Sequence, residues 1–274
     1  MNARTRRCWR NSIFTGLVSL AVIWLHAASR GSLHKVDYLT GWALFAVILF
    51  LAAYNGRKKL PFLPLGNSET WLQMHIYIGY LAFVIFLVHG NYRWPRGWFE
   101  ISLAAVFGVV MLSGVGGLIL SRQIPRRLAT RGGEVFYERI PAYRRVILEQ
   151  AEKLALESTK QTEATTLLEF YTNNLREVFA SRGRVLPHLL EDQSRLQRVL
   201  SRVEDLKRFT NETENRLLEQ FAELLREKDR LDYHAALQGL LKGWLFVHIP
   251  FTASLLLFTL AHIVLVFAFS SGAP

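Results

Sequence analysis

Residues 75–89 read HIYIGYLAFVIFLVH, and residues 248–262 read HIPFTASLLLFTLAH. Both stretches are apolar, and each begins and ends with a histidine at the same spacing of fourteen positions. At about 3.6 residues per helical turn, this spacing makes almost four turns, so both histidines lie near one helix face, about 21 Å apart along the axis. Each stretch therefore predicts a membrane-spanning helix with one imidazole near each end. The four residues are His75, His89, His248 and His262.

The composition is that of a membrane protein with basic flanks. Of the 274 residues, 51% are apolar, yet Lys and Arg number 33 against 22 Asp and Glu, so apolar and basic segments are segregated along the chain. The basic residues flank apolar segments and form no patch with interleaved aromatics, which favours contact with membrane lipid over nucleic-acid binding. The one cysteine, Cys8, excludes a disulfide framework, an iron–sulfur cluster on this chain's own thiolates, and haem attachment through Cys-x-x-Cys-His.

Five stretches are long and apolar enough to cross the hydrocarbon layer, which takes about 20 residues. The first follows several arginines, but it is longer than the apolar region of a typical signal peptide, so we interpret it as a retained anchor. The predicted fold is an all-α integral membrane helix bundle of about five spans with a helical cytoplasmic insert. The five stretches are residues 12–29, 38–55, 71–90, 99–121 and 240–270.

A charged, Leu-rich segment separates the fourth and fifth spans. Apolar residues recur at steps of three and four from Leu196 to Leu206 and from Leu217 to Leu231, as in two amphipathic helices that form an antiparallel hairpin. Asn211 and Glu214 supply an N-cap signature between them, and no strong breaker stands before span five, so the second helix could continue into the membrane as one rod. We also expect an earlier helix around 164–179 and a turn at Gly183 and Pro187. The predicted domains are spans one to four (1–121), the soluble insert (122–237) and span five (238–274).

Positive charges in the short loops predict the orientation of the spans, because cytoplasmic loops are enriched in Lys and Arg. If the spans alternate, most of these charges fall on one side, which places the N-terminus and the insert in the cytoplasm. The predicted location is a bacterial-type cytoplasmic (inner) membrane, crossed several times. The cytoplasmic charges include Arg57, Lys58, Lys59, Arg122, Arg126, Arg127 and Arg131, and the opposite ones are Arg30, Lys35, Arg93 and Arg96.

This orientation makes the third and fifth spans parallel. His75 would then lie beside His248 on the cytoplasmic side, and His89 beside His262 on the outer side. Antiparallel spans would instead bring His75 to His262 and His89 to His248, so the four histidines alone leave the partners open.

Two imidazoles that face each other can hold a haem iron between them. Neutral imidazoles in both axial positions leave the iron no open site, which suits electron transfer. A lone histidine in a span is more often a hydrogen-bond partner between helices, and metal transport would need carboxylates or sulfur that the spans almost lack. The doubled spacing therefore favours two haem groups that together reach across most of the apolar layer.

The histidine pairs on the third and fifth spans resemble those of the di-haem b-type transmembrane cytochromes of the ferric-reductase-like kind. More distantly, they resemble those of the cytochrome b subunit in bc complexes. The resemblance covers spans two to five and implies two haem b groups held by the four histidines. The chain departs from the flavin-linked reductases in lacking a sixth span and a following flavin- or nicotinamide-binding domain, and in carrying the insert where they have a short loop.

Haem propionates are anionic and need cationic or hydrogen-bonding partners at the membrane edge. Arg93 and Arg96, just beyond His89, are candidates for the outer haem, although a purely topological role explains each equally well. The candidates on the inner side are Arg57, Lys58, Lys59 and Lys242.

Several other residues are predicted to serve packing or position. Glycines on spans three and four permit close approach of a porphyrin or a helix, and Pro250 would kink span five and aim His248. The remaining histidines are interpreted as polar surface or packing residues, with His26 as a possible border of a quinone pocket. These residues are Gly79, Gly108, Gly114, Gly116 and Gly117, the histidines His26, His34, His188 and His234, and the interface anchors Trp71, Trp94, Trp98 and Trp244.

The predicted function is transmembrane electron transfer by a di-haem b-type cytochrome. The expected partners are the quinone pool and an extracytoplasmic redox protein such as a c-type cytochrome or an iron–sulfur protein. The chain would serve as the electron-transfer subunit of an oxidoreductase complex and could itself oxidise quinol. The alternative is a membrane sensor or scaffold that docks a partner through the helical insert, with the histidines serving structure.

Overall fold

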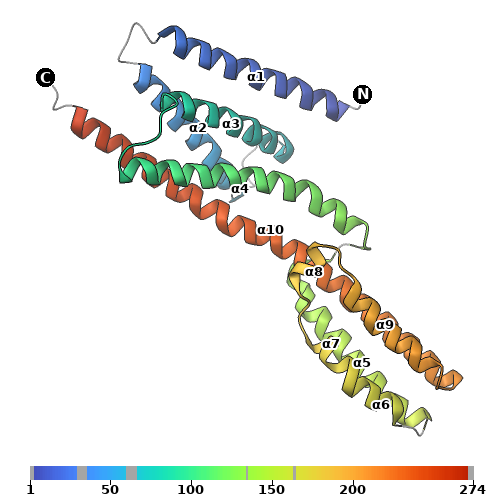
Figure 1. The fold of residues 1–274 in the computed structure, drawn as a ribbon. Coiled ribbons are helices and arrows are strands. Elements are labelled where there is room, and N and C mark those ends of the chain that lie inside the picture. The colour runs from blue at the N-terminus through green and yellow to red at the C-terminus, as the bar shows by residue number, and fades with distance from the viewer. Residues whose placement is uncertain (1–2, 30–35, 60–66, 134, 163–164, 271–274) are drawn as a thin grey trace. The chain divides into compact units, whose positions relative to one another are not determined.

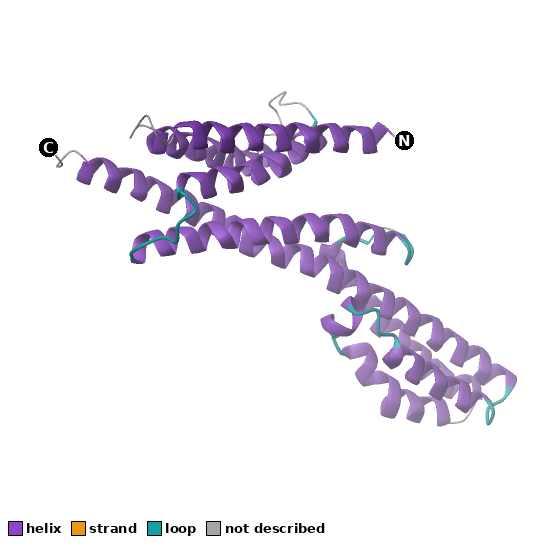
Figure 2. Cartoon of the chain, turned by 45° about the horizontal axis from the view of Figure 1, so that its top comes forward, coloured by secondary structure: helices purple, strands orange, loops and turns teal. Residues whose placement is uncertain are grey.

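The computed structural model describes residues 3–29, 36–59, 67–133, 135–162 and 165–270. These residues form helices joined by loops, with no strand among them (Figures 1 and 2), which confirms the predicted all-α class. The chain divides into two compact units. Unit 1 comprises Met1–Leu118 and Trp244–Pro274, and unit 2 comprises Ile119–Gly243.

Unit 1 contains the apolar helices. Four helices of the described residues are long and apolar enough to cross a membrane, and the predicted stretch 38–55 corresponds to a shorter apolar helix, Tyr38–Tyr54. The chain therefore has the character of a membrane protein. The helices of unit 1 are α1 (Ala3–Ser29), α2 (Val36–Lys59), α3 (Ser68–His89), the first part of α4 (Trp98–Ala129) and the last part of α10 (Glu212–Ser270).

A small apolar core joins α2, α3, α4 and α10 within unit 1. Phe86 packs against this core and stacks on Phe107, with their ring centroids 4.2 Å apart. Outside this core the helices present large apolar side chains to the surroundings, such as Phe14 and Trp24, which are 68% and 69% exposed. Apolar side chains directed outward are expected of helices surrounded by lipid. The buried core residues are Leu44, Ile48, Ala82, Ile85, Phe107 and Leu255.

Unit 2 has an apolar core of its own, built from α5, α6, α7, α9 and the first part of α10. Phe221, Leu218, Leu167 and Leu175 are fully buried in it. The helix expected around 164–179 is found as α6 and α7 joined by a π-helical segment. The elements of unit 2 are η1 (Tyr137–Arg139), α5 (Ile140–Thr162), α6 (Thr166–Phe170), η2 (Tyr171–Leu175), α7 (Arg176–Ala180), α8 (Val185–Leu189) and α9 (Ser194–Lys207).

The hairpin of α9 and α10 confirms the predicted cap. The Asn211 side chain accepts a hydrogen bond from the backbone N–H of Glu214 at 2.8 Å, and the Glu214 carboxylate accepts one from the N–H of Asn211 at 3.0 Å. This reciprocal capping box satisfies two donors that the first turn of a helix leaves open. The following helix, α10, runs without interruption for 59 residues, as the absence of a breaker predicted.

Of the predicted turn at Gly183 and Pro187, Gly183 lies in the loop between α7 and α8 as predicted, whereas Pro187 does not lie in the turn. Pro187 lies inside the short helix α8. Gly183 lies directly against the side chain of Asp232, where any side chain at position 183 would collide with it. Asp232 is buried, accepts a hydrogen bond from Lys228 at 2.6 Å, and forms an ion pair with Arg144 at 2.5 Å. Gly183 is thus required by the close approach to this buried ion cluster.

Candidate functional site

The four predicted histidines lie in unit 1 as two facing pairs. The ring centroids of His75 and His248 are 6.4 Å apart, and those of His89 and His262 are also 6.4 Å apart. All four side chains are half-buried. Because the earlier histidine of α3 faces the earlier one of α10, and the later one faces the later, the two helices run in the same direction.

The ring separation can be compared with that of two imidazoles bound to one iron. A ligating imidazole nitrogen lies about 2 Å from its metal, and the ring centroid lies about 1 Å farther away. Two imidazoles on opposite sides of one iron therefore have centroids about 6 Å apart. Both pairs match this distance, so the residues present fit bis-histidine ligation at two places about 21 Å apart along the helices.

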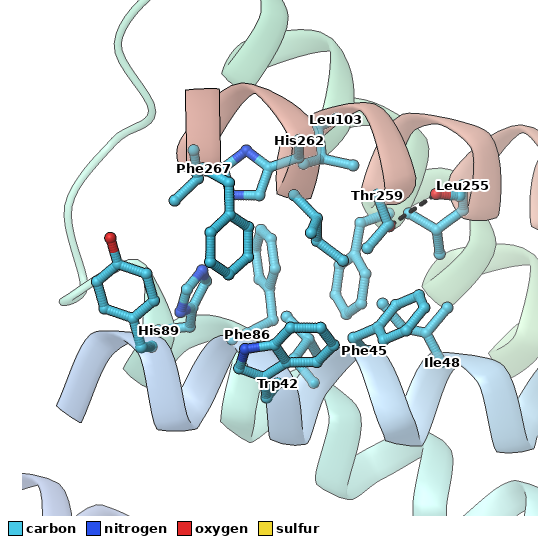
Figure 3. Close-up of a pocket in the computed structure, with 16 residues that line it drawn as sticks. Trp42, Phe45, Ile48, Phe86, His89, Leu103, Leu255, Thr259, His262 and Phe267 are labelled. Carbon is cyan, nitrogen blue, oxygen red and sulfur yellow. Dashed lines mark hydrogen bonds between the residues drawn. The ribbon is translucent and has the colours of Figure 1, made fainter. Parts of the chain in front are cut away.

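An apolar cavity of about 290 Å³ lies at the pair His89 and His262 and is lined by both residues. Figure 3 shows His262 on α10 across the cavity from Trp42 on α2. Phe86 of α3 and Phe107 of α4 close it from other sides. Aromatic and aliphatic walls around two convergent polar rings suit a flat, mostly apolar ligand.

The pair His75 and His248 lies between aromatic side chains. Tyr54 is tilted against His75 at a centroid distance of 5.1 Å, and Trp244 is stacked on His248 at 5.4 Å. The Trp244 indole donates a hydrogen bond to the backbone carbonyl of Ser113 at 2.7 Å. Trp244 was expected as an interface anchor, whereas its place in the structure is against a predicted ligand.

The histidines have polar neighbours that the spacing argument did not identify. The Thr40 hydroxyl lies 3.2 Å from Nδ1 of His89, and the Ser113 hydroxyl lies 2.8 Å from Nδ1 of His248. The only sequence signal of these contacts is that each hydroxyl residue is followed by glycine within an apolar span. That signal is too common in membrane helices to select these positions.

The predicted propionate partners lie in different settings. Arg93 and Arg96 are exposed in the loop that follows His89, and the backbone N–H of Arg96 donates to Glu100 at 2.9 Å. Lys242 forms an ion pair with Glu138 in unit 2, which holds the pKa of that carboxyl below its usual value. The side chains of Arg57, Lys58 and Lys59, at the end of α2, lie outside the described residues.

The other histidines do not join the pairs. His26 of α1 is buried, and its Nε2 lies 3.1 Å from the side-chain oxygen of Asn91, directly after α3. His188 and His234 lie in unit 2, where each packs edge to face against Tyr233. His34 lies outside the described residues.

Two of the five predicted glycines contact the inner site. Gly114 lies against the His248 ring, and Gly117 lies directly under the Trp244 indole, while Gly79, Gly108 and Gly116 border open space.

Pro250 lies inside α10, which continues through it. Of the remaining tryptophans, Trp71 stacks on Phe50, and Trp94 and Trp98 are 91% and 88% exposed.

Within the part of the chain that the structure describes, no group of three or more His, Cys, Asp or Glu residues could hold a metal ion by itself. A haem iron needs only two axial ligands from the protein, so this finding does not bear on the pairs. Comparisons with protein-family profiles, curated proteins and solved structures found no match to the chain. The geometry of the histidine pairs is therefore the observation from which a function can be inferred.

Proposed function

We propose that this chain is a di-haem b-type cytochrome that conducts electrons across a bacterial-type cytoplasmic membrane. The observation that carries the proposal is the equal 6.4 Å separation of two histidine pairs on parallel apolar helices. One pair of histidines within a membrane protein is readily explained by packing. Two pairs with the ring separation of axial ligands, and with an apolar cavity at one of them, are explained together by haem binding.

When bound, haem b supplies a one-electron carrier whose oxidation state changes without exchange of its axial ligands. His75 and His248 would hold the inner group, and His89 and His262 the outer one. The aromatic walls of the outer cavity would pack against the bound group, and Tyr54 and Trp244 contact the inner rings. Arg93 and Arg96 lie directly after His89 in the sequence, where their guanidinium groups would bind the propionates of the outer group.

The proposed donor is membrane quinol, and the proposed acceptor is a redox protein outside the membrane, such as a c-type cytochrome or an iron–sulfur protein. Oxidation of one quinol releases two electrons and two protons, so one quinol would supply two one-electron transfers. In this assignment the chain is the electron-transfer subunit of an oxidoreductase complex. Its insert, unit 2, would lie in the cytoplasm.

The test is the haem content of the full-length protein purified in detergent. We expect non-covalent protohaem at close to two per chain and reduced-minus-oxidised spectra typical of low-spin b haem. A folded, colourless protein after expression with ample haem supply would overturn the proposal and favour a sensor or scaffold. Reduction by a soluble quinol analogue, with and without a periplasmic cytochrome, then tests the donor and the acceptor.

A further inference from the structure

In each histidine pair, Nδ1 of one imidazole ring lies within hydrogen-bonding distance of a hydroxyl group on a third helix. Thr40 of α2 lies 3.2 Å from Nδ1 of His89 in the outer pair. Ser113 of α4 lies 2.8 Å from Nδ1 of His248 in the inner pair. Two helices without a predicted ligand, α2 and α4, thus each supply one hydroxyl to one pair.

The hydrogen bonds of Ser113 determine the tautomer of His248. A serine hydroxyl has a single hydrogen. Ser113 donates it to the backbone carbonyl of Val110 at 2.9 Å, so its oxygen accepts the hydrogen bond from His248 Nδ1–H. A neutral imidazole protonated at Nδ1 has its lone pair at Nε2, which is therefore the nitrogen available to a metal.

A glycine follows each hydroxyl residue and borders the same ring. A Cβ atom at position 41 would lie 3.0 Å from Cε1 of His89, which is closer than ordinary van der Waals contact. A Cβ atom at position 114 would lie 3.7 Å from Cε1 of His248, which is an ordinary contact. The ring of His89 is thus confined by Thr40 and Gly41 together, and the ring of His248 mainly by Ser113 and by the stacked Trp244.

We infer that Thr40 and Ser113 are the positioning residues of the two haem sites: each accepts Nδ1–H of one axial histidine, directs its Nε2 toward the iron, and fixes the plane of its ring. This inference rests on the proposed function. A hydrogen-bond acceptor at the non-ligating nitrogen raises the basicity of a ligating imidazole, and its loss typically weakens metal binding by about 10- to 100-fold. A neutral hydroxyl gives a smaller increase than a carboxylate would, which favours a comparatively high reduction potential at both sites.

The experiment measures each site separately in the full chain. In the H89A/H262A background, Ser113→Ala should raise the midpoint potential of the remaining inner haem, because a less basic imidazole stabilises ferric iron less. A tenfold loss in the preference for ferric over ferrous haem corresponds to about 59 mV. Ser113→Thr keeps the hydroxyl and should restore the potential.

The outer site is tested in the H75A/H248A background. Thr40→Val removes the hydroxyl at nearly constant shape and should raise the outer potential, whereas Thr40→Ser should not. The EPR spectrum of low-spin ferric haem depends on the angle between its axial imidazole planes, which is 90° for His89 and His262. Gly41→Ala should change the spectrum of the outer haem, and the matched Gly114→Ala should leave that of the inner haem unchanged.

The outcomes separate this inference from the proposed function. A wild-type protein without haem overturns the proposed function itself. Two haems in the wild type, with potentials and EPR spectra unchanged in both Ser113→Ala and Thr40→Val, overturn the positioning role alone. If Ser113→Ala loses the inner haem and Ser113→Thr retains it, the hydroxyl is required for haem binding at the inner site. The shift in potential is then measured at the outer haem in Thr40→Val.

Discussion

The imidazole rings of His75 and His248 lie edge to face with their centroids 6.4 Å apart, the same centroid distance that separates the rings of His89 and His262. Both pairs join α3 to α10, and in each helix the two histidines are fourteen positions apart. Equal spacing on two parallel helices brings both pairs into register at once. A shift of one helix by a single turn, about 5.4 Å, would separate both pairs together.

The pairing predicts which histidines can be lost together. His75→Ala or His248→Ala should each remove the inner haem, so the H75A/H248A double variant should still bind one haem per chain. The H75A/H262A variant removes one ligand from each pair and should bind none. Haem content and difference spectra of the purified variants measure this.

The control for the pairing prediction is a histidine outside the pairs. His188 lies in unit 2, so His188→Ala should leave the haem content at two per chain. One haem retained in H75A/H262A, with none in H75A/H248A, would contradict the pairing and require antiparallel helices.

Gly117 and Gly116 are adjacent in α4 but border different surroundings. A Cβ atom at position 117 would collide with the Trp244 indole, whereas one at position 116 would meet nothing within 4 Å. Gly117→Ala should therefore displace Trp244 from His248 and cost about 1–3 kcal/mol of stability through overpacking. Gly116→Ala should be neutral or slightly stabilising, because alanine is the better helix former. Thermal unfolding and tryptophan fluorescence in detergent compare the two variants.

The sequence alone predicts the apolar spans and the long helix well, because membrane length and helical periodicity leave strong signals. The capping box at Asn211 and Glu214 is likewise a local pattern, and it is found as predicted. The histidine pairs could be anticipated from spacing because a regular helix converts a sequence interval into a position on a face.

Helix α5 and the hydroxyl contacts were missed for a different reason. The buried face of α5 includes Ala151, Ala155 and Ser158, which are small residues and give little hydrophobic periodicity. Thr40 and Ser113 reach the histidines from other helices. Contacts of this kind depend on helix packing, which the sequence of one span does not determine.

The buried carboxylate of Asp232 supports the insert. It accepts a hydrogen bond from Lys228 and forms an ion pair with Arg144, and both Lys228 and Asp232 are buried. Asp232→Asn leaves two cations without their counter-charge, so we expect a loss of about 3–5 kcal/mol. Lys153→Ala, which breaks an exposed pair with Glu157, should cost about 1 kcal/mol or less. Denaturant unfolding followed by circular dichroism measures both, and equal losses would contradict the role of the cluster.

The orientation of the spans can be tested with reporter fusions. The basic loop residues predict that a reporter fused after Gly132 reads cytoplasmic and that one fused after Pro274 reads exterior. Gly132 precedes the insert, and Pro274 follows α10, whose apolar part comes after the insert. Both reporters on the same side would mean that α10 does not cross the membrane, and the proposed path for electrons would be lost.

The stability of unit 2 should depend on pH through His188. The pKa of His188 is lowered from its usual value of 6.5, first by burial, while Asp229 and Asp232 act to raise it and Arg131 and Lys228 to lower it. Below pH 6.5 the unfolded chain takes up a proton that the folded chain resists. Stability contributed by the neutral ring is thus complete above pH 6.5 and is lost as the pH falls through the lowered pKa.

His188→Gln should therefore flatten the decline in stability between about pH 7 and pH 5. Burial also lowers the pKa of His234, so part of the decline should remain. Burial raises the pKa of Asp229, so its effect on stability has the opposite sign. Stability falls as the pH rises from 3.8 through the raised pKa, because the unfolded chain loses this proton at a lower pH than the folded chain. Asp229→Asn in the His188→Gln background separates the two effects, and the readout is hydrogen exchange of the α8 amides at each pH. An unchanged pH dependence in His188→Gln would show that His188 does not titrate with folding.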